Sequence, residues 1–252
     1  TNCQDTLARS MVYRYDSNGR LTNVTDFTGR SVRYAYDSNG DLASVTTPAV
    51  TGTPNGNDFP SGKKVLYTYA SGFSDPRFNH NLISVTAPNE VALGGPPRLV
   101  AQYDTNFASP HADRLLSLRL GGTNLTGVVA GGKISYAYTS LGPAGNNDFA
   151  TPIFQNIVTN RNGNVTEYRF NQLGNIVRTI QFTRGVRSGD PPAYTNFAVF
   201  SADGELLART NAELDSVQYV FDSANADRFQ QGNLLQLTNS PGSIMNWQSF
   251  SI

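Results

Sequence analysis

The sequence has little charge and almost no cysteine. Only 15% of its 252 residues are charged, and 19 Lys and Arg balance 19 Asp and Glu. A chain without net charge does not steer toward nucleic acid or an anionic membrane, so we expect no nucleic-acid partner. Cys3 is the single cysteine, which excludes an intrachain disulfide and a thiolate metal cluster.

Long apolar runs are also missing. No stretch reaches the roughly 18 apolar residues of a membrane-spanning helix, so we expect no membrane insertion. Residues 1–5 lack the basic patch and the apolar run of a signal peptide. The chain begins without an initiator Met and ends abruptly, so we expect it to be part of a longer protein.

Turn-forming and aromatic residues are plentiful, with 23 Gly, 13 Pro, 12 Tyr and 14 Phe. Aromatic and β-branched residues fit a pleated, half-buried surface, and Gly and Asn tolerate the backbone angles of tight turns. The composition therefore predicts an all-β protein made of many short strands.

A motif repeats near the N-terminus. The segment YRYDSNGRLTNVT at 13–25 is matched by YAYDSNGDLASVT at 34–46, at a spacing of 21 residues. Two tyrosines separated by one residue lie on the same face of a strand. Asp-Ser-Asn-Gly predicts a turn, because Asp accepts hydrogen bonds from amides two residues on and Asn-Gly supplies positive-φ positions. One period thus predicts one hairpin.

The returning strand of the hairpin leaves its register open. Leu21 and Val24 are three residues apart, so simple alternation places them on opposite faces unless a bulge intervenes. The sequence does not choose between these two arrangements.

Looser copies follow when insertions in the turns are allowed. They begin at 67, 102, 136, 168, 200 and 219, which gives eight copies in all. In the sixth copy Phe replaces Tyr and Asn replaces Asp, and both substitutions keep an aromatic ring and an Asx turn. The residues expected to hold the repeat together are Tyr13, Tyr15, Asp16, Gly19, Leu21, Tyr34, Tyr36, Asp37, Gly40, Leu42, Tyr168, Phe170, Gly174, Tyr219, Phe221 and Asp222.

The pattern Tyr-x-Tyr-Asp-x-x-Gly-x-Leu-x-x-Val-Thr resembles the YD repeat of the Rhs-repeat family, found in bacterial Rhs proteins, Tc-toxin shells and teneurins. The resemblance extends over nearly the whole chain. It implies a spiral shell that encloses a cargo polypeptide, commonly a toxin domain, in a secreted or cell-surface protein. The chain lacks the motif that closes the C-terminal end of family shells, so we expect part of a wall.

We expect residues 1–252 to form a single array of tandem antiparallel β-hairpin repeats in a large curved or spiral sheet, a partial hollow shell. An isolated hairpin is marginal in water, so each repeat needs a neighbour to pair its open edge. Twist must coil a sheet of about sixteen strands, which encloses a lumen. The expected partners are the rest of a larger Rhs/YD protein or neighbouring subunits, and an enclosed polypeptide.

Catalytic patterns are missing. Autoproteolytic Rhs cores resemble aspartyl proteases through paired Asp-Pro-x-Gly motifs, but the Asp-Pro steps at Asp75 and Asp190 lack that Gly. His80 and His111 lie in inserted loops, and His111 with Asp113 lacks a third metal ligand or a nearby nucleophile. We therefore expect no enzymatic activity, no cofactor and no metal site.

Two alternatives stay open. In an extracellular adhesion or fibre-forming module, outward tyrosines or loop residues would contact carbohydrate or neighbouring subunits, although same-face aromatic pairs more simply hold a sheet together. Recognition would then fall to the irregular loops at 50–63, 70–80, 104–112, 139–152 and 184–195. A glycan-active enzyme ranks last, because no two carboxylates outside the turns have a suitable spacing.

Overall fold

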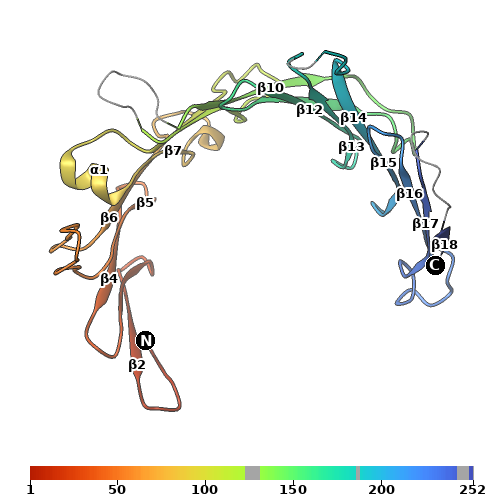
Figure 1. Ribbon diagram of the computed structural model, residues 1–252. Coiled ribbons are helices and arrows are strands. Elements are labelled where there is room, and N and C mark those ends of the chain that lie inside the picture. Colours follow the sequence, from red (N-terminus) through yellow and green to blue (C-terminus); the bar gives the residue numbers. More distant parts are fainter. Residues whose placement is uncertain (123–130, 186–187, 243–249, 252) are drawn as a thin grey trace. The chain divides into compact units, whose positions relative to one another are not determined.

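The computed structural model describes residues 1–122, 131–185, 188–242 and 250–251, and it divides into two compact units, Thr1–Lys133 and Ile134–Ile252 (Figure 1). The regular secondary structure of both units is almost entirely short antiparallel strands, so the all-β prediction is confirmed. In the described part of the chain no helix is long and apolar enough to cross a membrane. The single array over residues 1–252 stays a prediction.

The first unit is an antiparallel sheet in which strands pair in chain order. Its strands are β1 (Asn2–Gln4), β2 (Ser10–Tyr15), β3 (Leu21–Thr25), β4 (Ser31–Tyr36), β5 (Leu42–Thr46), β6 (Lys64–Tyr69), β7 (Leu82–Thr86), β8 (Leu99–Tyr103) and β9 (Leu115–Leu120). The 3₁₀-helix η1 (Pro76–Phe78) precedes β7, and α1 (Pro88–Leu93) follows it and contacts β6.

The second unit repeats this arrangement. Its strands are β10 (Lys133–Ser140), β11 (Phe154–Thr159), β12 (Val165–Phe170), β13 (Ile176–Phe182), β14 (Ala193–Phe200), β15 (Leu206–Thr210), β16 (Ser216–Phe221), β17 (Leu234–Ser240) and β18 (Phe250–Ser251). Each of the eight expected copies forms one antiparallel hairpin, from β2–β3 to β16–β17, so tandem hairpins are confirmed.

A β-bulge settles the register that the sequence left open. In the first copy Tyr13 lies opposite Val24 and Tyr15 lies opposite Leu21, because the register shifts by one residue between Arg14 and Tyr15. The same shift occurs in every hairpin except β10–β11. The extra residue brings the Leu and the Val to one face of the sheet, the face that carries the tyrosines.

The four-residue turns differ from the expectation in one respect. Asp16 Oδ1 accepts the N–H groups of Asn18 and Arg20 at 2.9 Å, and the Gly19 N–H donates to the Asp16 carbonyl at 3.1 Å. Gly19 has a φ of 77°, whereas Asn18 keeps a negative φ, so the expectation that both supply positive φ is wrong. The turn has a single left-handed residue, which matches a type I turn closed by a Gly bulge.

Fully buried apolar side chains are few and lie mainly in the expanded turns. Phe78, in η1, is 1% exposed. Its ring meets that of Phe107 edge-on with the centroids 4.6 Å apart, and Phe73 lies at 5.8 Å. Phe73 and Phe78 belong to the turn of the third copy and Phe107 to that of the fourth. The inserted residues therefore form a small apolar cluster that joins neighbouring repeats.

Candidate functional site

One face of the first unit, called here the tyrosine face, carries both tyrosines of the first three motifs, the single tyrosine of the fourth, and the Leu and Val side chains opposite them. The Tyr36 hydroxyl donates to the Leu21 carbonyl at 2.9 Å, and the Tyr103 hydroxyl donates to the Leu82 carbonyl at 3.2 Å. In both cases a tyrosine of one copy binds the backbone of the copy before it. Contacts that link one repeat to the next, such as these hydrogen bonds, are called joints here.

Arg20 forms a second joint between the first two copies. Its Nε lies 2.8 Å from Asp16 Oδ2 in its own turn, and its guanidinium lies 4.7 Å from the centre of the Tyr36 ring in the next copy. Gly40 sits beside it with a φ of 95°, and a Cβ at this position would come within 3.1 Å of the Arg20 side chain. The Gly of the motif thus both shapes the turn and leaves room for the arginine.

Polar contacts between successive turns continue along the same edge of the sheet. His80 Nδ1 lies 2.8 Å from Asp41 Oδ2, and Asn81 Nδ2 donates to Asp113 Oδ1 at 2.5 Å. The first contact joins the second and third copies, and the second joins the third and fourth. No group of three His, Cys, Asp or Glu that could hold a metal ion occurs among the residues described.

In the second unit, Asn171 takes the place of the motif Asp and is 2% exposed. Its Oδ1 accepts the N–H groups of Leu173 and Asn175 at 3.0 Å, and its Nδ2 donates to the Phe149 carbonyl at 2.8 Å. The Asn171 side-chain oxygen therefore closes its own turn, and the side-chain nitrogen holds the loop before β11. A carboxylate could not make the second contact, because it has no N–H to donate.

The remaining motif positions of the second unit lie on strands and turns like those of the first. Tyr168 and Phe170 are on β12, and Gly174 has a φ of 81° in the turn that follows. On β16, Tyr219 pairs with Leu237 and Phe221 with Leu234, and the Asp222 carboxylate accepts the Asn225 side-chain amide at 2.6 Å.

The Asp-Pro step at Asp75 is a helix cap. The Asp75 carboxylate accepts the Arg77 backbone N–H at 2.9 Å, and the Arg77 guanidinium approaches it to 2.6 Å. The arginine side chain and this backbone N–H lower the pKa of Asp75 below its ordinary value. A carboxylate held ionised in this way is a poor proton donor at neutral pH. Asp190 lies in the turn before β14. Residues 186–187 of the same connection are outside the described part of the chain.

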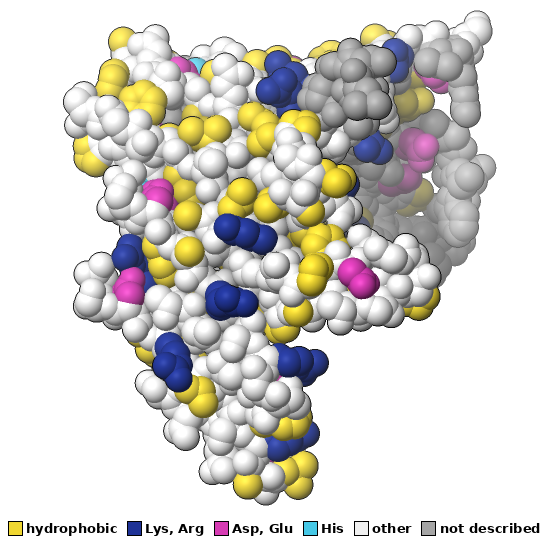
Figure 2. Space-filling model, turned by 90° about the vertical axis from the view of Figure 1, so that its left-hand side faces the viewer, with side chains coloured by type: hydrophobic (Ala, Val, Ile, Leu, Met, Phe, Trp, Pro, Cys, Tyr) yellow, Lys and Arg dark blue, Asp and Glu magenta, His cyan; other side chains and the backbone are white. Residues whose placement is uncertain are grey.

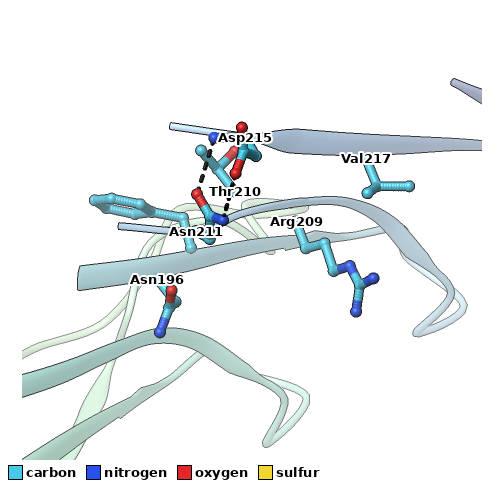
Figure 3. Close-up of a pocket in the computed structure, with 7 residues that line it drawn as sticks. Asn196, Arg209, Thr210, Asn211, Asp215 and Val217 are labelled. Carbon is cyan, nitrogen blue, oxygen red and sulfur yellow. Dashed lines mark hydrogen bonds between the residues drawn. The ribbon is translucent and has the colours of Figure 1, made fainter. Parts of the chain in front are cut away.

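A hollow of about 420 Å³ opens at the β15–β16 turn (Figure 3). Its described lining residues are Asn196, Phe197, Arg209, Thr210, Asn211, Asp215 and Val217. Asn211 Nδ2 donates to Asp215 Oδ2 at 2.9 Å, and the Asp215 N–H donates back to Asn211 Oδ1 at 2.8 Å.

The Asn211 and Asp215 side chains of this hollow are already engaged in the turn. The Gly242 N–H donates to Asp215 Oδ1 at 2.6 Å, and this bond and that from Asn211 lower the pKa of Asp215. The Arg209 side chain points away from the Asn211–Asp215 pair (Figure 3). Among the described lining residues, Asp215 is the one carboxylate and it is engaged in its turn, so these residues supply no acid–base pair for catalysis.

The joints between copies were not predicted from the sequence. Arg20, Asp41, His80 and Asn81 are not part of the motif, since Arg20, Asp41 and Asn81 occupy the variable position directly before the motif Leu and His80 lies in an insertion. A comparison of the residue types after each turn is the one sequence feature that points to them.

Residues 15–49 match the model of the family described as RHS Repeat. This stretch begins at Tyr15 and contains the complete second copy, so the resemblance to the Rhs repeat is confirmed for these residues. The match supports a structural repeat role. No curated protein matches the chain.

The chain also has a distant likeness to several solved structures. It aligns with the crystal structure of TcdB2-TccC3 at 15% identity and a TM-score of 0.30, over 98% of this chain and 15% of that one. With the Photorhabdus luminescens Tc holotoxin pore it shares 15% identity at a TM-score of 0.29, over 93% of this chain and 14% of that one. With a porin-like protein from Bacteroides uniformis it shares 10% identity at a TM-score of 0.25, over 96% of this chain and 92% of that one. The chain thus spans 15% of the length of the TcdB2-TccC3 chain it matches.

Proposed function

We propose that this chain is a wall segment of an Rhs/YD-type shell, part of a larger secreted or cell-surface bacterial protein that encloses a polypeptide such as a toxin domain. Its role would be sequestration, because a wall keeps proteases and partners away from what it encloses. We propose that no bond is made or broken by these residues.

The recurrence of one bulged hairpin in chain order is the observation that carries this proposal. Strands of each unit pair with their sequence neighbours, so a sheet of this kind lengthens by one hairpin for every repeat added. The contacts made by Tyr36 and Arg20 fix the second copy to the first, and the contact of Asn171 with Phe149 fixes the sixth copy to the fifth. We propose that the motif residues named from the sequence have this structural role and bind no ligand.

The match of residues 15–49 to the RHS Repeat model supports the same function. The engaged carboxylates of Asp75 and Asp215 also favour a structural role over hydrolysis, because each is already held by its own turn.

Electron microscopy of the native parent particle, with its mass measured in solution, tests the proposal. We expect a closed particle with internal density, and a segment inside it that resists protease until the particle is opened with denaturant. An open filament of end-to-end subunits would contradict enclosure and would favour an adhesion or fibre-forming module that contacts carbohydrate or neighbouring subunits.

A further inference from the structure

The strands of the first unit carry charge of one sign only. Strands β1–β9 contain no Asp or Glu, and their charged residues are Arg14, Arg33, Lys64 and Arg119. Strand pairing places all four on the face opposite the tyrosine face, called here the cation face. The acidic residues of this unit lie in turns and in α1.

Three of these cations form a row, in register, across the sheet. Arg14 pairs with Asn23, Asn23 with Arg33, Arg33 with Thr46, and Thr46 with Lys64. A cation therefore stands on every second strand, and neutral hydrogen-bonding side chains stand between them. With strands ~4.8 Å apart, successive cations of this row are separated by ~9.6 Å.

The row is available to a partner. Arg14, Arg33 and Lys64 are exposed, and none of them forms an ion pair within the described part of the chain. Lys64 shares the lining of a cavity of about 320 Å³ with Asp58, whose carboxylate accepts backbone N–H groups of the preceding loop.

Figure 2 shows the side of the first unit on which α1 lies, which is also the side of Lys64. Lys and Arg side chains are spread along this face with hydrophobic side chains between them, and the Asp and Glu side chains visible there lie toward its margins. Few carboxylates therefore lie between the basic side chains on this face.

We propose that the row Arg14–Arg33–Lys64 binds an acidic peptide in the polyproline II conformation, with a carboxylate at every third residue. This helix has 3 residues per turn and a rise of ~3.1 Å, so every third side chain points the same way at intervals of ~9.3 Å. That interval matches the ~9.6 Å between cations on alternate strands.

The side chains between the cations suit the same partner. A polyproline II segment has no internal hydrogen bonds, so its backbone groups are open to Asn23 and Thr46. The row also crosses the strands, so the peptide does not have to add to the sheet edge. The proposal is independent of whether the parent particle encloses anything.

Fluorescence anisotropy with the complete 252-residue chain tests this assignment. The probe is a labelled peptide of repeated Glu-Pro-Pro units at low salt. The triple variant Arg14→Gln, Arg33→Gln and Lys64→Gln removes three exposed ion pairs and weakens binding about tenfold. The control Lys133→Gln, Arg161→Gln and Arg228→Gln changes the net charge equally and leaves binding unchanged.

Two further variants separate charge from folding. Arg14→Lys with Arg33→Lys keeps the charges and retains binding, and circular dichroism of the Gln variant shows an unchanged strand content. A peptide of the same composition with its Glu residues clustered binds less tightly than the regular one.

Three results would overturn the proposal. They are equal binding of the clustered and regular peptides, unchanged binding by the Gln variant, and stronger competition from an oligonucleotide or a carboxylated polysaccharide of equal charge.

Discussion

The two units build the same hairpin with different turn residues. In the first unit Asp5, Asp16 and Asp26 accept the N–H groups two and four residues on, and in the second unit Asn160 and Asn211 do the same. The turn is therefore closed by the side-chain oxygen of an Asp or an Asn, and the negative charge of Asp is not needed to close it. At Asp5, Asp16 and Asp26 that charge is paired with an arginine four residues later, as in Asp16–Arg20.

The units also differ in register. Each of the four hairpins in the first unit has the bulge, whereas β10–β11 in the second unit pairs without it. There Tyr138 faces Asn156, and its ring stacks on that of Phe154 at 6.1 Å. Aromatic stacking holds this copy, while the bulged copies place an aliphatic side chain opposite the ring.

The largest effect is expected at the apolar cluster of the first unit. Phe78→Ala empties a fully buried site and lowers the free energy of unfolding by about 3–5 kcal/mol. Phe229, which is 98% exposed in a loop of the second unit, is the matched control. Phe229→Ala changes the stability by less than about 0.5 kcal/mol in the same urea titration. Equal effects of the two substitutions would show that the cluster contributes no packing energy.

The second largest effect is expected at Asn171. Asn171→Ala leaves the N–H groups of Leu173 and Asn175 and the Phe149 carbonyl without their partner, at a cost of about 2–3 kcal/mol. Asp16→Ala in the first unit costs less, because Asp16 is partly exposed and water replaces the lost acceptor. Thermal unfolding of both variants measures the difference. An Asp16 variant that melts lower than the Asn171 variant would reverse this ranking.

A smaller effect distinguishes two turns of equal shape. Leu214 has a φ of 71° where the first-unit turn has Gly19 with a φ of 77°. A left-handed conformation costs a side chain roughly 1–2 kcal/mol, so Gly19→Ala destabilises by about 1 kcal/mol. Leu214→Gly relieves the same strain and stabilises by roughly 0.5 kcal/mol after the entropy of the unfolded glycine is subtracted. Destabilisation by Leu214→Gly would mean that its side chain contributes packing.

The smallest effect is a difference in pH dependence between the units. The Thr28 hydroxyl and the Arg30 guanidinium lower the pKa of Asp26 from 3.8 to about 2. A lowered pKa in the folded state means that this stabilisation is complete above pH 3.8 and is lost as the pH falls through about 2. The Asn160 turn has no such group.

Hydrogen exchange, corrected for its intrinsic pH dependence, measures this contrast. The amides of Thr28 and Arg30 lose protection on acidification from about pH 4 to 2, and those of Asn162 and Asn164 do not. In the variant Asp26→Asn, the protection of the Thr28 and Arg30 amides no longer depends on pH. Parallel loss at both turns in the wild-type chain would show that unfolding of a whole unit, and not the cap, is being measured.

The sequence predicted the hairpins well because turn chemistry and alternation are local. Asp16 and Gly19 determine the first turn within four residues, and the Tyr-x-Tyr spacing identifies a strand face. The bulge opposite Arg14 was not predictable, because a three-residue spacing from Leu21 to Val24 is compatible with two registers. The joint from Tyr36 to Leu21 was also missed, since it depends on how neighbouring copies pair.

The candidate sites were harder to predict for the same reason. The cation row depends on the register of four successive strand pairs, which brings Arg14, Arg33 and Lys64 into line although they are separated by unequal distances in the chain. The engagement of Asp75 and Asp215 by their own turns likewise follows from side-chain geometry that residue types alone do not determine.

Interchangeability of the repeats is the central claim, and deleting one period tests it most directly. Removal of residues 17–37 joins Asp16 to Ser38 and restores the motif Tyr-Arg-Tyr-Asp-Ser-Asn-Gly. We predict that this chain folds with one hairpin fewer and melts cooperatively at a lower temperature. A control lacking residues 17–26 breaks the period and unfolds the first unit. If circular dichroism shows equal loss of strand content in both deletions, the copies are not interchangeable and the account is contradicted.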